Sequence, residues 1–273
     1  MAVEAGAGLW THSLALLSDA LHMFSDALAL GLAGWAARIS HRRPTAEKTF
    51  GFKRFEVLAA FANSVVLLIL GVGLAGKAVL RFWNPHPVEA GPMMVVALAG
   101  LLLNVGILAW LHHAEEEKNL NEEGVFWHVL GDALGSIAAL VAGALLYWKG
   151  WLWADSAATL IIAGVLAFGS LRVLRKSGHI LVEGAPEGLD PEAVRKAMLD
   201  IPQVQEVHDL HLWTLNGRDL FLSAHVTTVP GADSEQKVVA GLRRELAGRF
   251  GVHHITLQSG QCEADDCVND CGP

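Results

Sequence analysis

The chain has 273 residues, of which 52% are hydrophobic and 18% are charged, and its mean hydropathy is +0.38. This composition excludes an ordinary soluble globular protein, because such proteins contain less apolar and more charged sequence. A formal net charge of −8 and a pI near 5.9 argue against a nucleic-acid partner.

Five apolar segments follow one another over residues 1–176. Residues 1–12 are too short to span a bilayer and look like the end of a helix, without the basic region of a signal peptide. Each apolar segment has roughly the 20 residues that a spanning helix needs. They are Leu14–Ser40, Phe55–Leu80, Met93–Leu111, Val125–Trp148 and Ala154–Leu174. This pattern predicts an all-α transmembrane helical bundle, and the odd count of spans indicates one further helix upstream.

The loop after the first apolar segment is strongly basic. Its cations are Arg42, Arg43, Lys48, Lys53 and Arg54. Arg172, Arg175 and Lys176 lie at the end of the fifth segment in the same way. The positive-inside rule places both regions in the cytoplasm, and therefore also the chain that follows. Frequent Ala, Gly and Leu favour a bacterial inner (cell) membrane.

Residues 177–261 have the composition of a small soluble domain. Asp190 and Pro191 predict the N-cap and the first residue of a helix, and Asn216-Gly217 predicts a hairpin turn. The remaining elements are predicted from their periodicity: strands over 204–215 and 218–229, a helix over 234–250 and a strand over 252–259. The order α-β-β-α-β predicts a two-layer α+β domain.

Ionisable residues inside the apolar segments point to a metal site. His22 and Asp26 stand one helical turn apart, and His128 and Asp132 repeat the same spacing. An ionisable group at mid-membrane costs roughly 2.5–3.5 kcal/mol, so such groups face a polar interior. Two imidazoles and two carboxylates form a tetrahedral set suited to zinc. The alternative is that each pair is structural and hydrogen-bonded between helices. Helix-packing hydrogen bonds are predicted for three further polar residues, Asn63, Asn104 and Asp155.

Several stretches, taken in order, resemble the cation diffusion facilitator family of zinc transporters. They are SLALLSDALHMFSDALAL, FGFKRFEVLAA, HVLGDALGS, VHDLHLWTL, SAHV and HHITLQ. The resemblance covers nearly all of residues 9–262. It implies six transmembrane helices with a cytoplasmic ferredoxin-like domain. It also implies a homodimer that exports a divalent cation against an inward flow of protons.

The resemblance also assigns site residues. It implies that His22, Asp26, His128 and Asp132 form the transport site, and histidine at both first positions favours zinc, with cadmium or cobalt as secondary ions. Protons are the expected counter-ion, since an imidazole with a reference pKa near 6.5 exchanges proton for metal at physiological pH. The family sometimes has a weaker zinc site in the loop after its second helix, which makes His41 a candidate.

Histidines and cysteines gather in the C-terminal part of the chain. His208 and His225 lie on the two strands of the predicted hairpin, and the acidic tail, residues 262–273, holds three cysteines. An odd number of cysteines there favours metal binding or free thiols over disulfides. We expect a regulatory zinc site that ties two protomers together. The favoured ligands are His208, His225, His254, Cys262 and Cys271.

Other classes of function have less support. The chain shows no nucleophile paired with a base and no phosphate-binding glycine loop, so an enzyme or an ATP-driven pump is not expected. Two alternatives to a zinc exporter stay open. One is a metal-binding regulatory membrane subunit that does not transport, and the other is the same fold exporting cadmium, cobalt or manganese.

Overall fold

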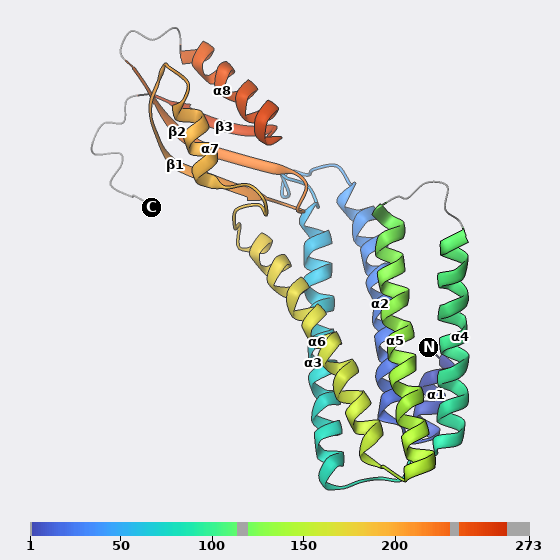
Figure 1. Cartoon of the computed structure of the whole chain (residues 1–273). Coiled ribbons are helices and arrows are strands. Elements are labelled where there is room, and N and C mark those ends of the chain that lie inside the picture. The colour runs from blue at the N-terminus through green and yellow to red at the C-terminus, as the bar shows by residue number, and fades with distance from the viewer. Residues whose placement is uncertain (1, 114–119, 230–234, 261–273) are drawn as a thin grey trace. The chain divides into compact units, whose positions relative to one another are not determined.

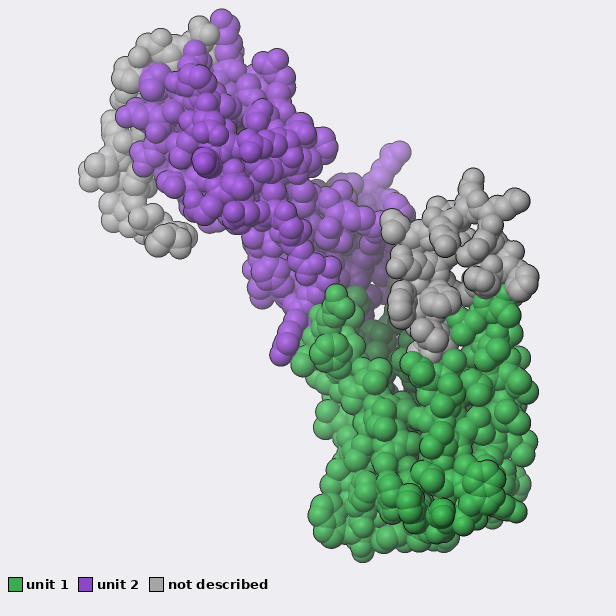
Figure 2. Space-filling view, viewed as in Figure 1, with its two compact units in different colours: residues 1–34, 60–174 green, residues 35–59, 175–273 purple. Residues whose placement is uncertain are grey.

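The computed structural model describes residues 2–113, 120–229 and 235–260, without the side chains of residues 33, 110–113 and 120–131. The chain divides into two compact units (Figure 2), residues 1–34 with 60–174 and residues 35–59 with 175–273. The second unit therefore contains the loop between the first two long helices as well as the C-terminal domain. The boundaries between the units fall inside three of the long helices.

The first unit is helical (Figure 1). Its helices, three of which continue into the second unit, are α1 (Ala2–Trp10), α2 (Leu14–Ser40), α3 (Arg54–Trp83), α4 (Ala90–His113), α5 (Leu120–Lys149) and α6 (Trp153–Leu181). Helices α2 to α6 are long and apolar enough to cross a membrane. The five predicted spans are thus confirmed. The bounds of α2 match the prediction, whereas α3 to α6 are longer because these helices continue into polar sequence, as α6 does to Leu181.

Small side chains form the interior of this unit. α4 packs along α5, and α1 packs against α4. The buried core of this unit contains Leu16 and Met93, and its other members are all alanines. These are Ala7, Ala15, Ala97, Ala139, Ala142, Ala154 and Ala158. Small residues let helix backbones approach closely, which is the usual basis of packing between membrane helices.

Large apolar side chains cover the outside of the same helices. Leu30, Ile69, Leu103 and Phe168 are each between 66% and 75% exposed. A soluble protein rarely leaves so many large apolar groups in contact with water. This inverted arrangement, with alanine inside and large side chains outside, fits helices surrounded by lipid.

The C-terminal domain has a three-stranded sheet and two helices. Its elements are α7 (Pro191–Leu199), β1 (Val204–Thr214), β2 (Leu220–Thr228), α8 (Glu235–Phe250) and β3 (His254–Ser259). The strand order is β1-β2-β3, with β1 antiparallel and β3 parallel to β2. Met198 of α7 and Leu242 of α8 share a buried core with Leu222 of the sheet. The predicted α-β-β-α-β order is confirmed.

Two local predictions in this domain are also confirmed. The Asp190 side chain accepts a hydrogen bond from the Glu192 N–H at 3.1 Å, which makes it the N-cap of α7. In the hairpin, the Asn216 side-chain oxygen accepts from the N–H groups of Arg218 and Asp219 at 3.1 and 2.9 Å. Gly217 has a φ of +83°, a conformation that favours glycine.

Candidate metal centre

α2 presents two side chains of the kinds that bind metal ions, one turn apart. The distance from His22 Nδ1 to Asp26 Oδ2 is 3.8 Å. This contact follows from the α-helical spacing, because residues i and i+4 lie on one face. The two side chains are 26% and 28% exposed, so they are mostly enclosed by the helices of the first unit.

A third side chain reaches the same place from α5. His22 Nε2 lies 3.6 Å from Asp132 Oδ1, and Asp132 is only 12% exposed at its side chain. One ligand atom from each of His22, Asp26 and Asp132 lies within 4.8 Å of the others. Among the described residues this is the one group of three or more potential metal ligands that meets that limit.

The fourth residue of the predicted site is His128. It lies in α5, four residues before Asp132. Its side chain is outside the described part of the chain, and its role as a ligand therefore remains a prediction.

The three side chains can bind a divalent ion if their ligand atoms move slightly closer together. Zinc binds nitrogen and oxygen at about 2.0–2.2 Å in a tetrahedron, which puts neighbouring ligand atoms about 3.3–3.6 Å apart. His22 and Asp132 present atoms 3.6 Å apart, and the ligand atoms of all three residues lie within 4.8 Å of one another. A bound cation also offsets the burial of two carboxylates, which is otherwise unfavourable.

Two glycines leave room for buried carboxyl groups near this site. A Cβ atom at Gly135 would lie 3.0 Å from Oδ1 of Asp19, which sits one turn before His22. A Cβ atom at Gly100 would lie 3.0 Å from Oε1 of Glu4. Asp19 and Glu4 are 4% and 7% exposed. Glu4 was not predicted to be a buried polar residue. The signal that could have identified it is an acidic residue shortly before an apolar segment.

The C-terminal sheet brings two of the predicted cytoplasmic ligands together. His208 and His225 are direct partners in the β1–β2 register, and their ring centroids are 5.4 Å apart. Asp209 adjoins the pair in a β-bulge, with a φ of +53°. Its Oδ2 lies 3.9 Å from His225 Nε2, and its Oδ1 lies 3.0 Å from His211 Nε2.

The other predicted cytoplasmic ligands lie elsewhere. His254 is opposite Phe221 in the β2–β3 register, and its ring is 4.6 Å from the Phe221 ring. Phe221 precedes His225 by four strand positions, or about 13 Å, so one chain does not bring His254 to the histidine pair. Cys262 and Cys271 are outside the described residues. His41 is exposed at the C-terminal end of α2.

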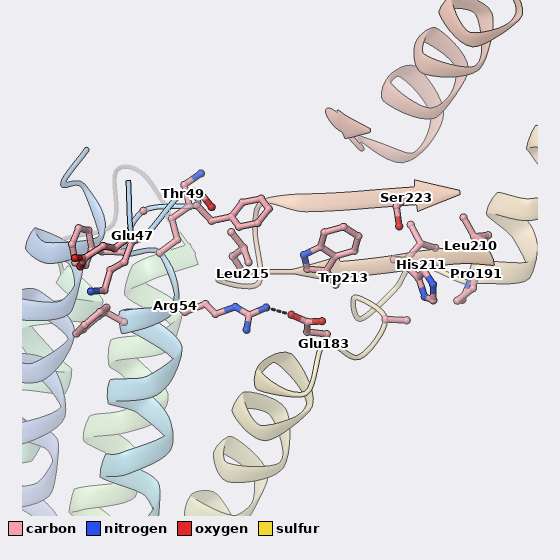
Figure 3. A pocket seen from close by; sticks show the side chains of 18 residues that line it. Glu47, Thr49, Arg54, Glu183, Pro191, Leu210, His211, Trp213, Leu215 and Ser223 are labelled. Carbon is pink, nitrogen blue, oxygen red and sulfur yellow. Dashed lines mark hydrogen bonds and ion pairs between the residues drawn. The ribbon is translucent and has the colours of Figure 1, made fainter. Parts of the chain in front are cut away.

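The second unit also contains a cavity of about 900 Å³ between the α2–α3 loop and β1 (Figure 3). Arg54 and Glu183 form an ion pair there, with 2.5 Å between Nη2 and Oε1. Lys53 forms another with Asp219, at 2.9 Å. The Lys53 hydrogen bond is the largest cause of the lowered pKa of Asp219. These pairs anchor the loop to the C-terminal domain.

Comparison with known proteins adds family information. A model described as the cation efflux transmembrane domain matches residues 1–182, and one described as the cation efflux protein cytoplasmic domain matches residues 186–261. The zinc transporter ZitB of Escherichia coli (strain K12) is 38% identical over 270 residues, covering 98% of this chain and 86% of that protein.

Two further relatives have a similar extent of match. The cadmium, cobalt and zinc/H(+)-K(+) antiporter of Bacillus subtilis (strain 168) is 35% identical over 94% of this chain and 84% of that protein. The metal cation efflux system protein CzcD of Cupriavidus metallidurans is 34% identical over 97% of this chain and 84% of that protein.

Proposed function

Because this chain belongs to the cation efflux family of membrane transporters, we propose that it is a multi-pass zinc exporter that exchanges zinc for protons. The observation that supports this most directly is the meeting of His22 and Asp26 of α2 with Asp132 of α5. His128 completes the proposed transport site. Zinc is the proposed substrate because one or two imidazoles with two carboxylates match its preferred ligands and geometry.

The same ligands explain how protons drive the transport. Metal binding requires a neutral imidazole and ionised carboxylates, so each proton that binds competes with the metal. We propose that zinc binds when the site is open to the cytoplasm, and that protons displace it when the site is open to the more acidic outside. The coupling therefore needs no separate proton-binding cofactor.

Flux into vesicles tests this function. Purified protein is reconstituted into proteoliposomes, and zinc transport is followed with an interior fluorescent indicator, with and without an imposed pH gradient. We expect gradient-dependent zinc flux that Asp26→Asn reduces by about tenfold or more, equivalent to about 1.4 kcal/mol or more of the barrier. Asp200→Asn, a change at an exposed residue of the C-terminal domain, serves as the control. Flux that ignores the gradient contradicts proton exchange.

The two alternatives give different results in the same assay. A regulatory subunit binds zinc but shows no flux at any gradient. A transporter for another metal shows flux of cadmium, cobalt or manganese that zinc does not inhibit. The names of the relatives, which include zinc, cadmium and cobalt, support zinc as the main substrate with cadmium and cobalt as further ions.

We also propose that the C-terminal domain is a cytoplasmic zinc sensor in a homodimer. The match to the family's cytoplasmic domain and the His208–His225 pair support this. Two imidazoles leave a tetrahedral ion two ligands short. His254, Cys262 and Cys271 are the proposed further ligands, supplied by a second chain or by the tail. Zinc bound in this way links two protomers and favours one arrangement of their helices.

A further inference from the structure

Helix α2, which carries two of the metal ligands, begins with a cap that another helix supplies. The first N–H groups of a helix have no partner within it. Ser13 Oγ accepts from the Leu16 N–H at 3.2 Å, as an ordinary N-cap does. The N–H groups of Leu14 and Ala15 donate instead to the two carboxylate oxygens of Asp155, at 2.9 and 3.2 Å.

The Asp155 carboxylate lies among several complementary groups. Asp155 is in the first turn of α6 and is 1% exposed. The Ser13 hydroxyl donates to its Oδ1 at 2.5 Å. Arg81, near the end of α3, has its Nη1 3.3 Å from Oδ2 and donates to the His12 carbonyl at 2.6 Å. The N-termini of α2 and α6 add positive partial charge, so the buried anion is balanced.

We propose that Asp155, held by Arg81, is a positioning residue for transport that fixes the N-terminal end of α2. His22 and Asp26 lie about 12 and 18 Å along the helix from Leu14 at 1.5 Å per residue, so Asp155 does not touch the metal. It acts through the direction of α2, because the ends of α2, α3 and α6 are joined at this carboxylate. This inference rests on the proposed transport function.

The joined ends affect turnover more than affinity. Access to the site changes from one side to the other only if the helices that carry the ligands move. A fixed end makes α2 tilt as a rigid element, whereas a free end lets its first turn unwind and uncouples the motion. The ligand atoms themselves stay in place, so the concentration of zinc at half-maximal rate changes little.

Substitutions can remove the contacts one at a time. Both carboxylate oxygens of Asp155 accept hydrogen bonds, whereas an asparagine at this position has only one acceptor oxygen. Asp155→Asn therefore loses the ion pair with Arg81 and part of the cap of α2. Arg81→Gln removes the cation alone, and Ser13→Ala removes one hydroxyl. Asp155→Glu restores the carboxylate on a longer side chain. Ser170→Ala, at a buried serine of the same helix, is the matched control.

Zinc flux in proteoliposomes with a fixed pH gradient tests the proposal. We expect Asp155→Asn to lower kcat by about tenfold and to leave KM for zinc within about twofold, the pattern of a group that acts only on turnover. Arg81→Gln has a smaller effect of the same kind, Asp155→Glu recovers part of the rate, and Ser170→Ala transports as the wild type. Wild-type kcat in Asp155→Asn, or a KM raised about tenfold with kcat unchanged, overturns the proposal.

Hydrogen exchange gives a readout that does not depend on transport. The amides of Leu14 and Ala15 should exchange about tenfold faster in Asp155→Asn, because a lost cap opens the first turn. They should exchange faster to a smaller extent in Arg81→Gln, because the carboxylate that caps them then lacks its cation. If wild-type protein shows no flux, the proposed function fails while exchange still tests the cap. If Asp155→Asn does not elute as folded protein, the kcat and the amide exchange of Arg81→Gln and Ser13→Ala test the proposal instead. Wild-type kcat and wild-type exchange in both overturn the proposal.

Discussion

The imidazole Nε2 of His22 lies 3.6 Å from Oδ1 of Asp132, although the two residues belong to α2 and α5. Nδ1 of the same ring faces Asp26 at 3.8 Å. The histidine therefore stands between two carboxylates, with one ring nitrogen facing each of them. Two of the predictions below concern this candidate site and its surroundings, and two concern the second unit.

The first prediction concerns the choice of metal. His22→Asp replaces a nitrogen ligand with oxygen, and oxygen ligands suit manganese better than zinc. We expect zinc flux to fall by about tenfold or more and manganese flux to rise relative to zinc. Competition between the two ions for transport in proteoliposomes measures this. His86→Asp, an exposed histidine outside the site, is the control and should keep the wild-type preference.

The second prediction concerns the space next to Asp19. Gly135→Ala puts a Cβ atom 3.0 Å from the Asp19 carboxylate, which is closer than normal contact. We expect a loss of about 1–3 kcal/mol in stability, as for other overpacked interiors, and a lower Tm in detergent. Gly164→Ala is the matched control, since nothing lies within 4 Å of its Cβ position. A Tm of Gly135→Ala no lower than that of Gly164→Ala contradicts the close approach of Gly135 to Asp19.

The third prediction concerns pH and the ion pair between Lys53 and Asp219. The hydrogen bond from Lys53 lowers the pKa of Asp219 from its ordinary 3.8. A lowered pKa means that the stabilisation is complete above pH 3.8 and is lost as pH falls through the lower folded value. Both side chains are 42% exposed, so the pair contributes at most about 1 kcal/mol.

Asp219→Asn tests this dependence. The difference in Tm between wild type and variant should be constant from about pH 7 to pH 5 and should disappear in stronger acid, because the carboxylate is then protonated in both states. Asp200→Asn should show no such difference. A difference that disappears near pH 6, where histidine titrates, would instead assign the effect to an imidazole.

The fourth prediction concerns the sheet of the C-terminal domain. His225→Ala removes one imidazole of the His208–His225 pair, so zinc binding attributable to this domain should weaken by about tenfold or more. Equilibrium dialysis with the proposed transport site disabled by Asp132→Asn isolates this binding. His211→Ala is the comparison, since His211 contacts the other carboxylate oxygen of Asp209. Equal loss in both variants would mean that His211 is itself a ligand.

Much of the fold could be predicted because its signals are local. The five spans follow from the lengths of apolar segments, and the N-cap at Asp190 follows from one residue and the proline after it. The His22–Asp26 contact also follows from helical spacing. Each of these features depends on residues within one or two turns of one another.

Other features depend on how distant segments pack, and sequence patterns do not contain that information. His254 and His225 are both on the sheet, but the crossover through α8 pairs His254 with Phe221 rather than with a histidine. Asp155 was expected to make helix-packing hydrogen bonds, which the structure confirms. That its partner is the start of α2 depends on which helix ends meet, so spacing alone could not reveal it.

Anomalous diffraction at the zinc edge, from crystals of the zinc-loaded protein, tests the central claim most directly. We expect a peak within about 2.0–2.2 Å of ligand atoms from His22, Asp26 and Asp132. Zinc found at other places only, with these three side chains bound to no ion in crystals of transport-competent protein, would contradict it.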